Sequence, residues 1–120
     1  MNELRQSVRN QLIKYHSSVY YEQAPNNANF PFVVFLLSNT TMIDDLEMLK
    51  LDVNVYSNQS VSELETIAES IWQGLKRYTE TNAYHSLTIH KDRRITLEEE
   101  DKSIKRRLLT FNVRYMTKEV

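Results

Sequence analysis

The stretch that decides the fold runs from residue 84 to residue 120 and reads YHSLTIHKDRRITLEEEDKSIKRRLLTFNVRYMTKEV. Apolar and polar side chains alternate on both sides of a charged centre, which is the pattern of strands buried on one face. Leu87 and Ile89 belong to the first apolar series, and Phe111 and Val113 belong to the second. The stretch therefore predicts one long C-terminal β-hairpin whose turn is charged.

This hairpin is long for a small domain. An arm of about a dozen residues spans roughly 40 Å, whereas a single helix is about 10–12 Å across. We therefore expect the charged end to project beyond the core and to contact a neighbouring subunit, with the acidic turn meeting basic flanks. The predicted contact residues are Arg93, Arg94, Glu98, Glu99, Glu100, Asp101, Lys105, Arg106 and Arg107.

Composition narrows the class of protein. The chain has 120 residues, of which 41% are hydrophobic and 26% charged, and its net charge is -1. These values predict one globular domain over residues 1–120, without the bulk positive charge typical of nucleic-acid-binding domains. The absence of cysteine excludes disulfides and thiolate sites, and a single glycine excludes glycine-rich phosphate loops. The N-terminus lacks the apolar run of a signal peptide. The most apolar run, residues 30–37, is too short to span a bilayer, so we expect a soluble protein.

Periodicity predicts the remaining elements. A four-residue apolar spacing predicts a helix over residues 1–15, and a second helix over 60–78 begins with a capping box formed by Ser60 and Glu63. Alternation or apolar runs predict strands at 19–22, 30–37 and 49–56. Residues 38–46 are expected to form a loop or a splayed hairpin end, and residues 79–83 a linker.

The element order predicts an α+β domain. We expect a mostly antiparallel sheet of four to five strands, with both helices packed on one face. The other face of the sheet is more polar and is expected to meet water or a partner subunit. Its predicted side chains are Lys50, Asp52, Asn54, Arg106, Thr110, Asn112 and Arg114.

The sequence contains no catalytic or metal-binding motif. His16, His85 and His90 do not form the helical pairs of zinc sites, and His85 and His90 are five residues apart in one predicted strand, so they point to opposite faces. The acidic runs at 44–45 and 98–101 lack the spacing and glycine of a calcium loop. Our expectation of no enzyme, no metal and no cofactor rests on this motif search. General acid–base residues meet in space and not in sequence, so a motif search does not detect them.

The basic residues around the charged turn permit a second interpretation, a nucleic-acid contact. Glu98, Glu99, Glu100 and Asp101 stand between the two basic groups and would repel phosphates. We therefore favour a subunit interface over a merely solvated turn, and both over a nucleic-acid-binding module.

Three stretches together resemble a known family. They are 20–25 (YYEQAP) with 30–35 (FPFVVF), 51–56 (LDVNVY) before an amphipathic helix, and 94–101 (RITLEEED) leading into 104–115 (IKRRLLTFNVRY). In this order they resemble the tail terminator, or tail completion, proteins of long-tailed bacteriophages and prophages. The resemblance covers nearly the whole chain, although its segments build a fold and contain no catalytic motif.

The resemblance implies a small α+β subunit without enzymatic activity. Such proteins form a homo-oligomeric ring, typically a hexamer, that caps the tail tube, stops its polymerisation and provides the surface for joining the head. It implies the major tail tube protein and a head-closure protein as partners, with DNA only passing through the lumen and no membrane. The expected location is the tail–head junction of the virion, after assembly in the host cytoplasm. Another head–tail joining or adaptor subunit is the alternative within the same class.

Overall fold

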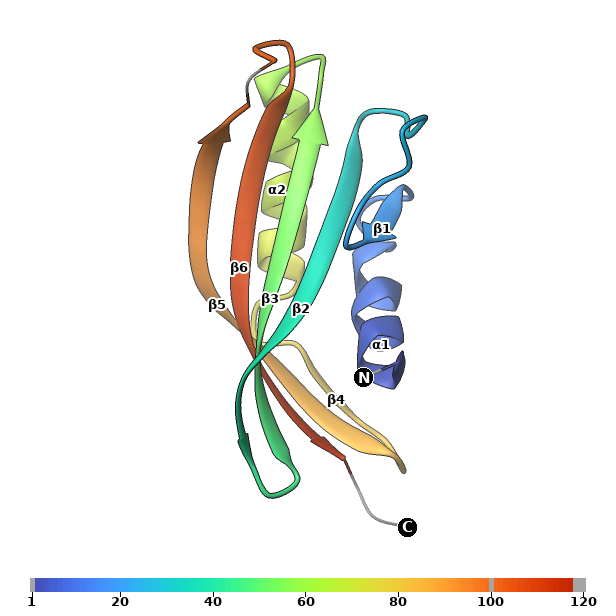
Figure 1. Ribbon diagram of the computed structural model, residues 1–120, viewed down its shortest axis with the longest axis vertical. Coiled ribbons are helices and arrows are strands. Elements are labelled where there is room, and N and C mark those ends of the chain that lie inside the picture. Colours follow the sequence, from blue (N-terminus) through green and yellow to red (C-terminus); the bar gives the residue numbers. More distant parts are fainter. Residues whose placement is uncertain (1, 100, 118–120) are drawn as a thin grey trace.

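The computed structural model describes residues 2–99 and 101–117. The body is elongated, 49 × 24 × 22 Å, with strands running along its length (Figure 1). The elements are α1 (Asn2–Leu12), β1 (Val19–Tyr21), β2 (Phe32–Ile43), β3 (Leu46–Ser57), α2 (Val61–Gly74), β4 (Thr79–Thr81), β5 (His85–Glu98) and β6 (Lys105–Thr117).

One sheet contains all six strands, in the order β1-β2-β3-β6-β5-β4. Strand β1 is parallel to β2, and the other neighbours are antiparallel. The predicted α+β class and the mostly antiparallel sheet are confirmed, but the sheet has six strands and not four to five. The additional strand, β4, lies in the segment expected to be a linker. Its Thr-Glu-Thr sequence offers no apolar alternation by which it could be recognised.

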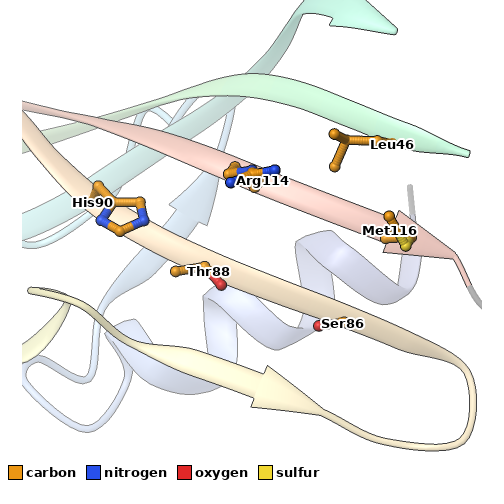
Figure 2. Close-up of a pocket in the computed structure, with 6 residues that line it drawn as sticks. All are labelled: Leu46, Ser86, Thr88, His90, Arg114 and Met116. Atoms are coloured by element: carbon orange, nitrogen blue, oxygen red, sulfur yellow. The ribbon is translucent and has the colours of Figure 1, made fainter. Parts of the chain in front are cut away.

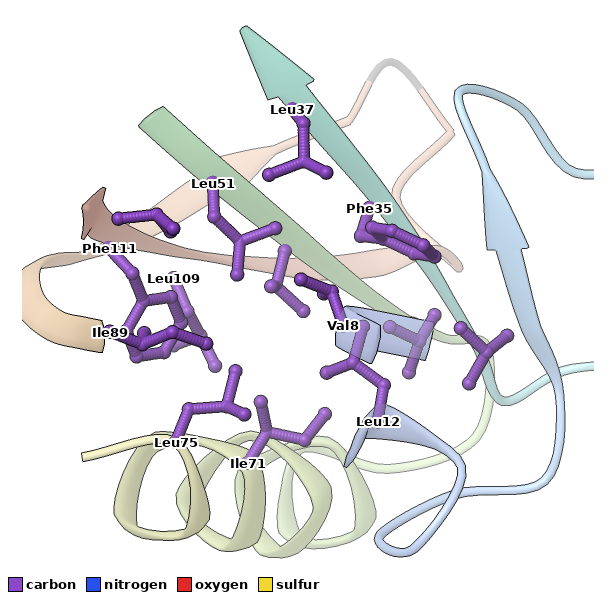
Figure 3. Close-up of a cluster of buried hydrophobic side chains, with 14 of the residues drawn as sticks. Val8, Leu12, Phe35, Leu37, Leu51, Ile71, Leu75, Ile89, Leu109 and Phe111 are labelled. Carbon is purple, nitrogen blue, oxygen red and sulfur yellow. The ribbon is translucent and has the colours of Figure 1, made fainter. Parts of the chain in front are cut away.

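Both helices pack on the same face of the sheet and enclose the core (Figure 3). Helix α1 contributes Leu4, Val8 and Leu12, which fall on one side of the helix at a spacing of four and are fully or almost fully buried. Helix α2 contributes a second buried stripe, formed by Leu64, Ala68 and Ile71. These side chains meet the inward faces of the strands, including Phe35, Leu51, Val53, Leu109 and Phe111.

Helix α2 begins as predicted and ends earlier. The Ser60 hydroxyl accepts a hydrogen bond from the Glu63 N–H at 3.0 Å, which is the N-cap half of the predicted capping box. The Glu63 carboxylate instead accepts from the Ser57 hydroxyl at 3.0 Å. The helix stops at Gly74, four residues before the predicted end, and the chain turns at Arg77, which has a φ of 54°.

The β2–β3 hairpin is longer than expected, because residues 38–46 continue both strands up to a turn at Asp44 and Asp45. Asp44 adopts the left-handed conformation, with a φ of 53°, which aspartate tolerates better than most residues. A register shift between Asn39 and Thr41 marks a β-bulge in β2. Figure 1 shows this hairpin end extending beyond both helices.

The long C-terminal hairpin is confirmed, with β5 and β6 paired from His85 and Thr117 to Glu98 and Lys105. The prediction that its charged end projects uncovered from the core is wrong. Helix α2 runs along the strands and not across them (Figure 1), and its 14 residues span about 21 Å. The charged strand ends therefore lie beside the N-terminal half of α2.

Neither helix is long and apolar enough to cross a membrane, within the part of the chain that the structure describes.

Candidate functional site

The arginines that the sequence marks as contact residues face different sides of the sheet. Arg94 points toward α2, where its Nη1 donates to Glu69 Oε2 at 2.7 Å and its Nη2 lies 3.7 Å from Glu65 Oε2. Hydrogen bonds from Gln73 and Arg94 lower the pKa of the Glu69 carboxyl. Arg107 also turns to α2, and its Nε donates to Glu65 Oε1. Two of the predicted contact residues thus bind the helix of their own chain.

Arg106 lies on the opposite face of the sheet. Its Nη1 donates to the Tyr56 hydroxyl at 3.1 Å, and its guanidinium carbon lies 5.6 Å from the centroid of the Tyr56 ring. Its Nε forms an ion pair with Glu99 Oε1 at 3.2 Å. Phosphate contacts use cationic groups that can exchange their counterions. Because Arg94, Arg106 and Arg107 are engaged by side chains of the same chain, the structure favours the nucleic-acid interpretation even less than the sequence does.

The other predicted contact residues are spread along the same end. Arg93 is exposed on the helix-free face, and Lys105 is partly buried. Asp101 stabilises the turn by accepting hydrogen bonds from the Ser103 N–H at 2.9 Å and the Ser103 hydroxyl at 2.7 Å, which lower the pKa of its carboxyl. Glu98 ends β5, but its side chain lies outside the described part of the structure, as does all of Glu100.

The partners of the arginines were missed at the sequence level, although a signal was present. Glu65 and Glu69 are four residues apart and therefore share one face of α2. Neither belongs to the apolar stripe, so an acidic stripe beside the core stripe is visible in the sequence. A neighbouring strand rich in arginine is the natural partner for such a stripe.

A pocket of about 220 Å³ opens between the start of α2 and the β5–β6 turn. Val61, Leu97 and Ile104 supply apolar lining. Lys102, Lys105 and Arg107 add three cationic side chains, against one described carboxylate, that of Glu99. The described lining therefore combines an apolar surface with the cationic side chains of Lys102 and Lys105, while Arg107 is bound to Glu65.

The helix-free face of the sheet is polar at its middle. Lys50 Nζ donates to Asp92 Oδ2 at 2.7 Å and to Asn112 Oδ1 at 3.0 Å, and the Thr110 hydroxyl donates to Asp92 Oδ2 at 3.0 Å. The hydrogen bonds from Lys50 and Thr110 lower the pKa of the Asp92 carboxyl. Burial raises the pKa of the nearby Asp52 carboxyl. This arrangement confirms the predicted polar face.

Aromatic side chains gather on one end of the same face. The rings of Phe32 and Tyr56 stack with centroids 4.9 Å apart, and Phe30 and Tyr20 pack around Phe32 at 4.9 Å and 6.2 Å. The sequence predicts burial of both faces of this strand, but neither described helix covers Phe32 or Leu36. Leu36 remains 39% exposed. The apolar run therefore serves the core on one side and an open surface on the other.

A second pocket, of about 190 Å³, lies on the helix-free face at the opposite end of the molecule (Figure 2). Leu46, Met116, Arg114 and His90 line it, from three adjacent strands. His85 lies on the other face of β5 and is buried. The predicted separation of His85 and His90 onto opposite faces is confirmed.

His85 belongs to a polar cluster that ties α1 to β4 and β5. Its Nε2 lies 2.5 Å from Glu80 Oε2, which also accepts from the Ser7 hydroxyl at 2.8 Å, while the Tyr78 hydroxyl donates to Glu80 Oε1 at 3.1 Å. Ser7 thus binds the carboxylate and not the imidazole, so the cluster lacks the serine–histidine contact of a nucleophile and its base. Among the described residues, no group of three or more histidine, aspartate or glutamate side chains is placed to hold a metal ion.

Comparison with known proteins finds similarity in structure and none in sequence. No protein-family model matches the chain, and no curated protein matches it in sequence. The fold is shared with a chain of a solved structure described as "Virion of native gene transfer agent (GTA) particle". The TM-score is 0.73, the sequence identity is 14%, and the match covers 91% of each chain. At this identity the match establishes the common fold.

Proposed function

We propose that this protein is a structural subunit of a phage-type virion and, more specifically, a tail terminator. The observation that carries the proposal is the shared fold with a chain of a gene transfer agent virion, which extends over 91% of both chains. The resemblance to tail terminators supplies the finer assignment, and it rests on residues 20–25, 30–35, 51–56, 94–101 and 104–115. The first line of support rests on backbone geometry and the second on sequence.

In this role, copies of the chain form a closed ring, typically of six, on the end of the tail tube. Each subunit presents one surface to the next, and rotation closes the ring so that no filament grows. The ring stops addition of tube protein and offers its other side to a head-closure protein. DNA passes through the lumen without being read. The proposed role needs no cofactor and no enzymatic step.

The open face of the sheet fits a subunit that is completed by its neighbours. Apolar and aromatic groups gathered on an exposed face typically mark protein–protein contact sites. Here the aromatic cluster around Phe32 and the exposed Leu36 lie beside the ordered polar group of Lys50 and Asp92. A mixture of apolar patches and fixed polar groups is the usual make-up of an interface.

Light scattering and negative-stain microscopy over a concentration series test the ring. We expect particles with the mass of six chains and end-on views with a central hole, either in solution or on the ends of isolated tail tubes. A protein that stays monomeric and also leaves tube ends bare would overturn the tail terminator assignment. Binding to the head connector without binding to tubes would favour the alternative, another head–tail adaptor subunit.

A further inference from the structure

We propose that the tip of the β2–β3 hairpin, residues 42–45, docks into the pocket between α2 and the β5–β6 turn of a second copy of this chain. This inference rests on the proposed function, because it supplies the contact through which one subunit of the ring holds the next. It also moves the predicted interface: the charged turn of β5–β6 becomes the receiving site, and the β2–β3 tip becomes the inserted arm.

The tip presents apolar side chains that its own chain leaves uncovered. Met42 is 61% exposed and Ile43 is 59% exposed. They are followed at once by the exposed carboxylates of Asp44 and Asp45. The hairpin end extends past both helices (Figure 1), so its apolar groups gain burial most readily from another molecule. The tip is therefore a short apolar group that ends in negative charge.

The receiving pocket has the complementary character. Val61, which is 45% exposed, lines it together with Leu97 and Ile104. The described lining also carries Lys102 and Lys105, whereas its third cation, Arg107, is already bound to Glu65 of its own chain. Val61 is also the first residue of α2, so the partial positive charge of the helix N-terminus adds to the attraction for carboxylates.

The geometry requires two molecules. The tip lies at one end of a body 49 Å long, and the elements that border the pocket, the start of α2 and the β5–β6 turn, lie at the other end (Figure 1), so a chain cannot fill its own pocket. Joining the tip of one copy to the pocket of the next creates a heterologous contact, which yields a ring when rotation closes it. Apolar burial would supply affinity, and the charges would fix the register and exclude wrong pairings.

Disulfide trapping tests the contact directly, because the chain contains no cysteine. The variant Ile43→Cys/Val61→Cys places one thiol on the tip and one in the pocket. Under mild oxidation we expect a ladder of covalent dimers, trimers and larger species at protein concentrations that support assembly. The matched control Ile43→Cys/Ile13→Cys, with its second thiol on an exposed site after α1, is expected to give no ladder.

A charge exchange provides an independent test that does not depend on oxidation. Asp45→Lys and Lys105→Glu are each expected to weaken self-association, raising the dissociation constant on the order of tenfold. Both substitutions in one chain are expected to restore much of the association. Circular dichroism and thermal unfolding confirm that each variant folds, since both positions lie at the ends of hairpins.

The outcomes separate this inference from the proposed function. A lack of tip-to-pocket disulfides in a protein that forms rings on tubes overturns the docking and leaves the terminator role standing. A covalent ladder in a protein that never binds tube ends supports the docking and overturns the role. A product that stops at the dimer reveals reciprocal pairing and overturns the head-to-tail arrangement. A chain that gives no tip-to-pocket disulfide either in solution at any concentration or on tube ends overturns the docking itself.

Discussion

Lys50 Nζ lies 2.7 Å from Asp92 Oδ2, so a side chain of β3 is joined to the bulge of β5 across the intervening strand β6. Asn112 of β6 accepts a second hydrogen bond from the same ammonium group. The bridge orders the middle of the face that the helices leave open. Because an interface forms more readily from groups that are already fixed, this order favours docking of a partner.

Asp92→Asn is expected to reduce the free energy of unfolding by about 0.5–1 kcal/mol, because both charges are partly exposed and screened by solvent. A double-mutant cycle with Lys50→Gln, measured by urea unfolding at low and high salt, isolates the pair. The coupling is expected to shrink at high salt. Asp45→Asn, at the exposed hairpin tip, serves as the control for loss of one charge. A coupling energy of zero between Lys50 and Asp92 would show that their ion pair does not contribute to the free energy of unfolding.

Glu80 is expected to make stability sensitive to acid. Burial alone would raise the pKa of its carboxyl, but hydrogen bonds from His85, Ser7 and Tyr78 lower the pKa overall. The folded state thus favours the carboxylate. The ionised Glu80 carboxylate contributes fully to folding stability when the pH is above the glutamate pKa of the unfolded chain, about 4.3. This stabilisation is lost as the pH falls through the lower pKa of Glu80 in the folded state. Chemical unfolding between neutral pH and about pH 3 measures this loss.

In Glu80→Gln, the dependence of stability on pH in the acid range is expected to flatten. Glu22→Gln, at an exposed loop position, is the control and is expected to follow the parent chain. If the Glu80 variant and the parent lose stability in parallel as the pH falls, the cluster around His85 is not the source of the acid sensitivity.

Gly74→Ala is expected to destabilise the protein, against the general helix preference for alanine. A Cβ at Gly74 would lie 2.1 Å from Tyr15 Cζ, so the ring has to leave its place against the end of α2. Overpacking of this kind costs about 1–3 kcal/mol. In a Tyr15→Ala background the same substitution is expected to be neutral or stabilising. Thermal unfolding of the parent chain, the two single variants and the double variant tests this prediction. Equal effects of Gly74→Ala in the presence and absence of the Tyr15 ring would contradict it.

Trp72→Ala is expected to cost about 3 kcal/mol, the lower end for truncation of a large aromatic residue, because the side chain is only partly buried. The centroids of the Trp72 and Phe111 rings are 5.2 Å apart, and Lys91 Nζ lies 4.8 Å from the centroid of the Trp72 ring. Trp72→Phe is expected to cost less, since it keeps an aromatic ring against Phe111. A near-neutral Trp72→Ala, measured by urea unfolding, would mean that this side of α2 is not part of the core.

The sequence predicts the elements that have strong local signals. The β5–β6 hairpin and the start of α2 are confirmed because apolar alternation and the cap at Ser60 act locally, although a bulge between Lys91 and Arg93 shifts the register of β5. The far half of the β2–β3 hairpin was missed because Ser38 to Thr41 are polar on both faces and contain a bulge. Cross-strand pairing, and not burial, holds that segment in a strand.

The site was less predictable than the fold. The residues of the charged turn are predicted from their charge, but whether Arg94 and Arg107 face a partner or α2 depends on where the helix lies along the sheet. The acidic pair Glu65 and Glu69 indicates that α2 has a basic neighbour, but it does not encode which strand lies beside it. The apolar tip at Met42 and Ile43 was likewise hidden, because its importance comes from its distance from the helices and not from its composition.

Polymerisation of the purified tail-tube protein of the same particle, with and without this chain, tests the central claim most directly. Electron microscopy measures the tube lengths and the structure of the tube ends. We predict that the chain stops elongation and places a ring on one end of each tube. Tubes that grow to the same length with bare ends, at concentrations where this chain is folded and in excess, would contradict the account.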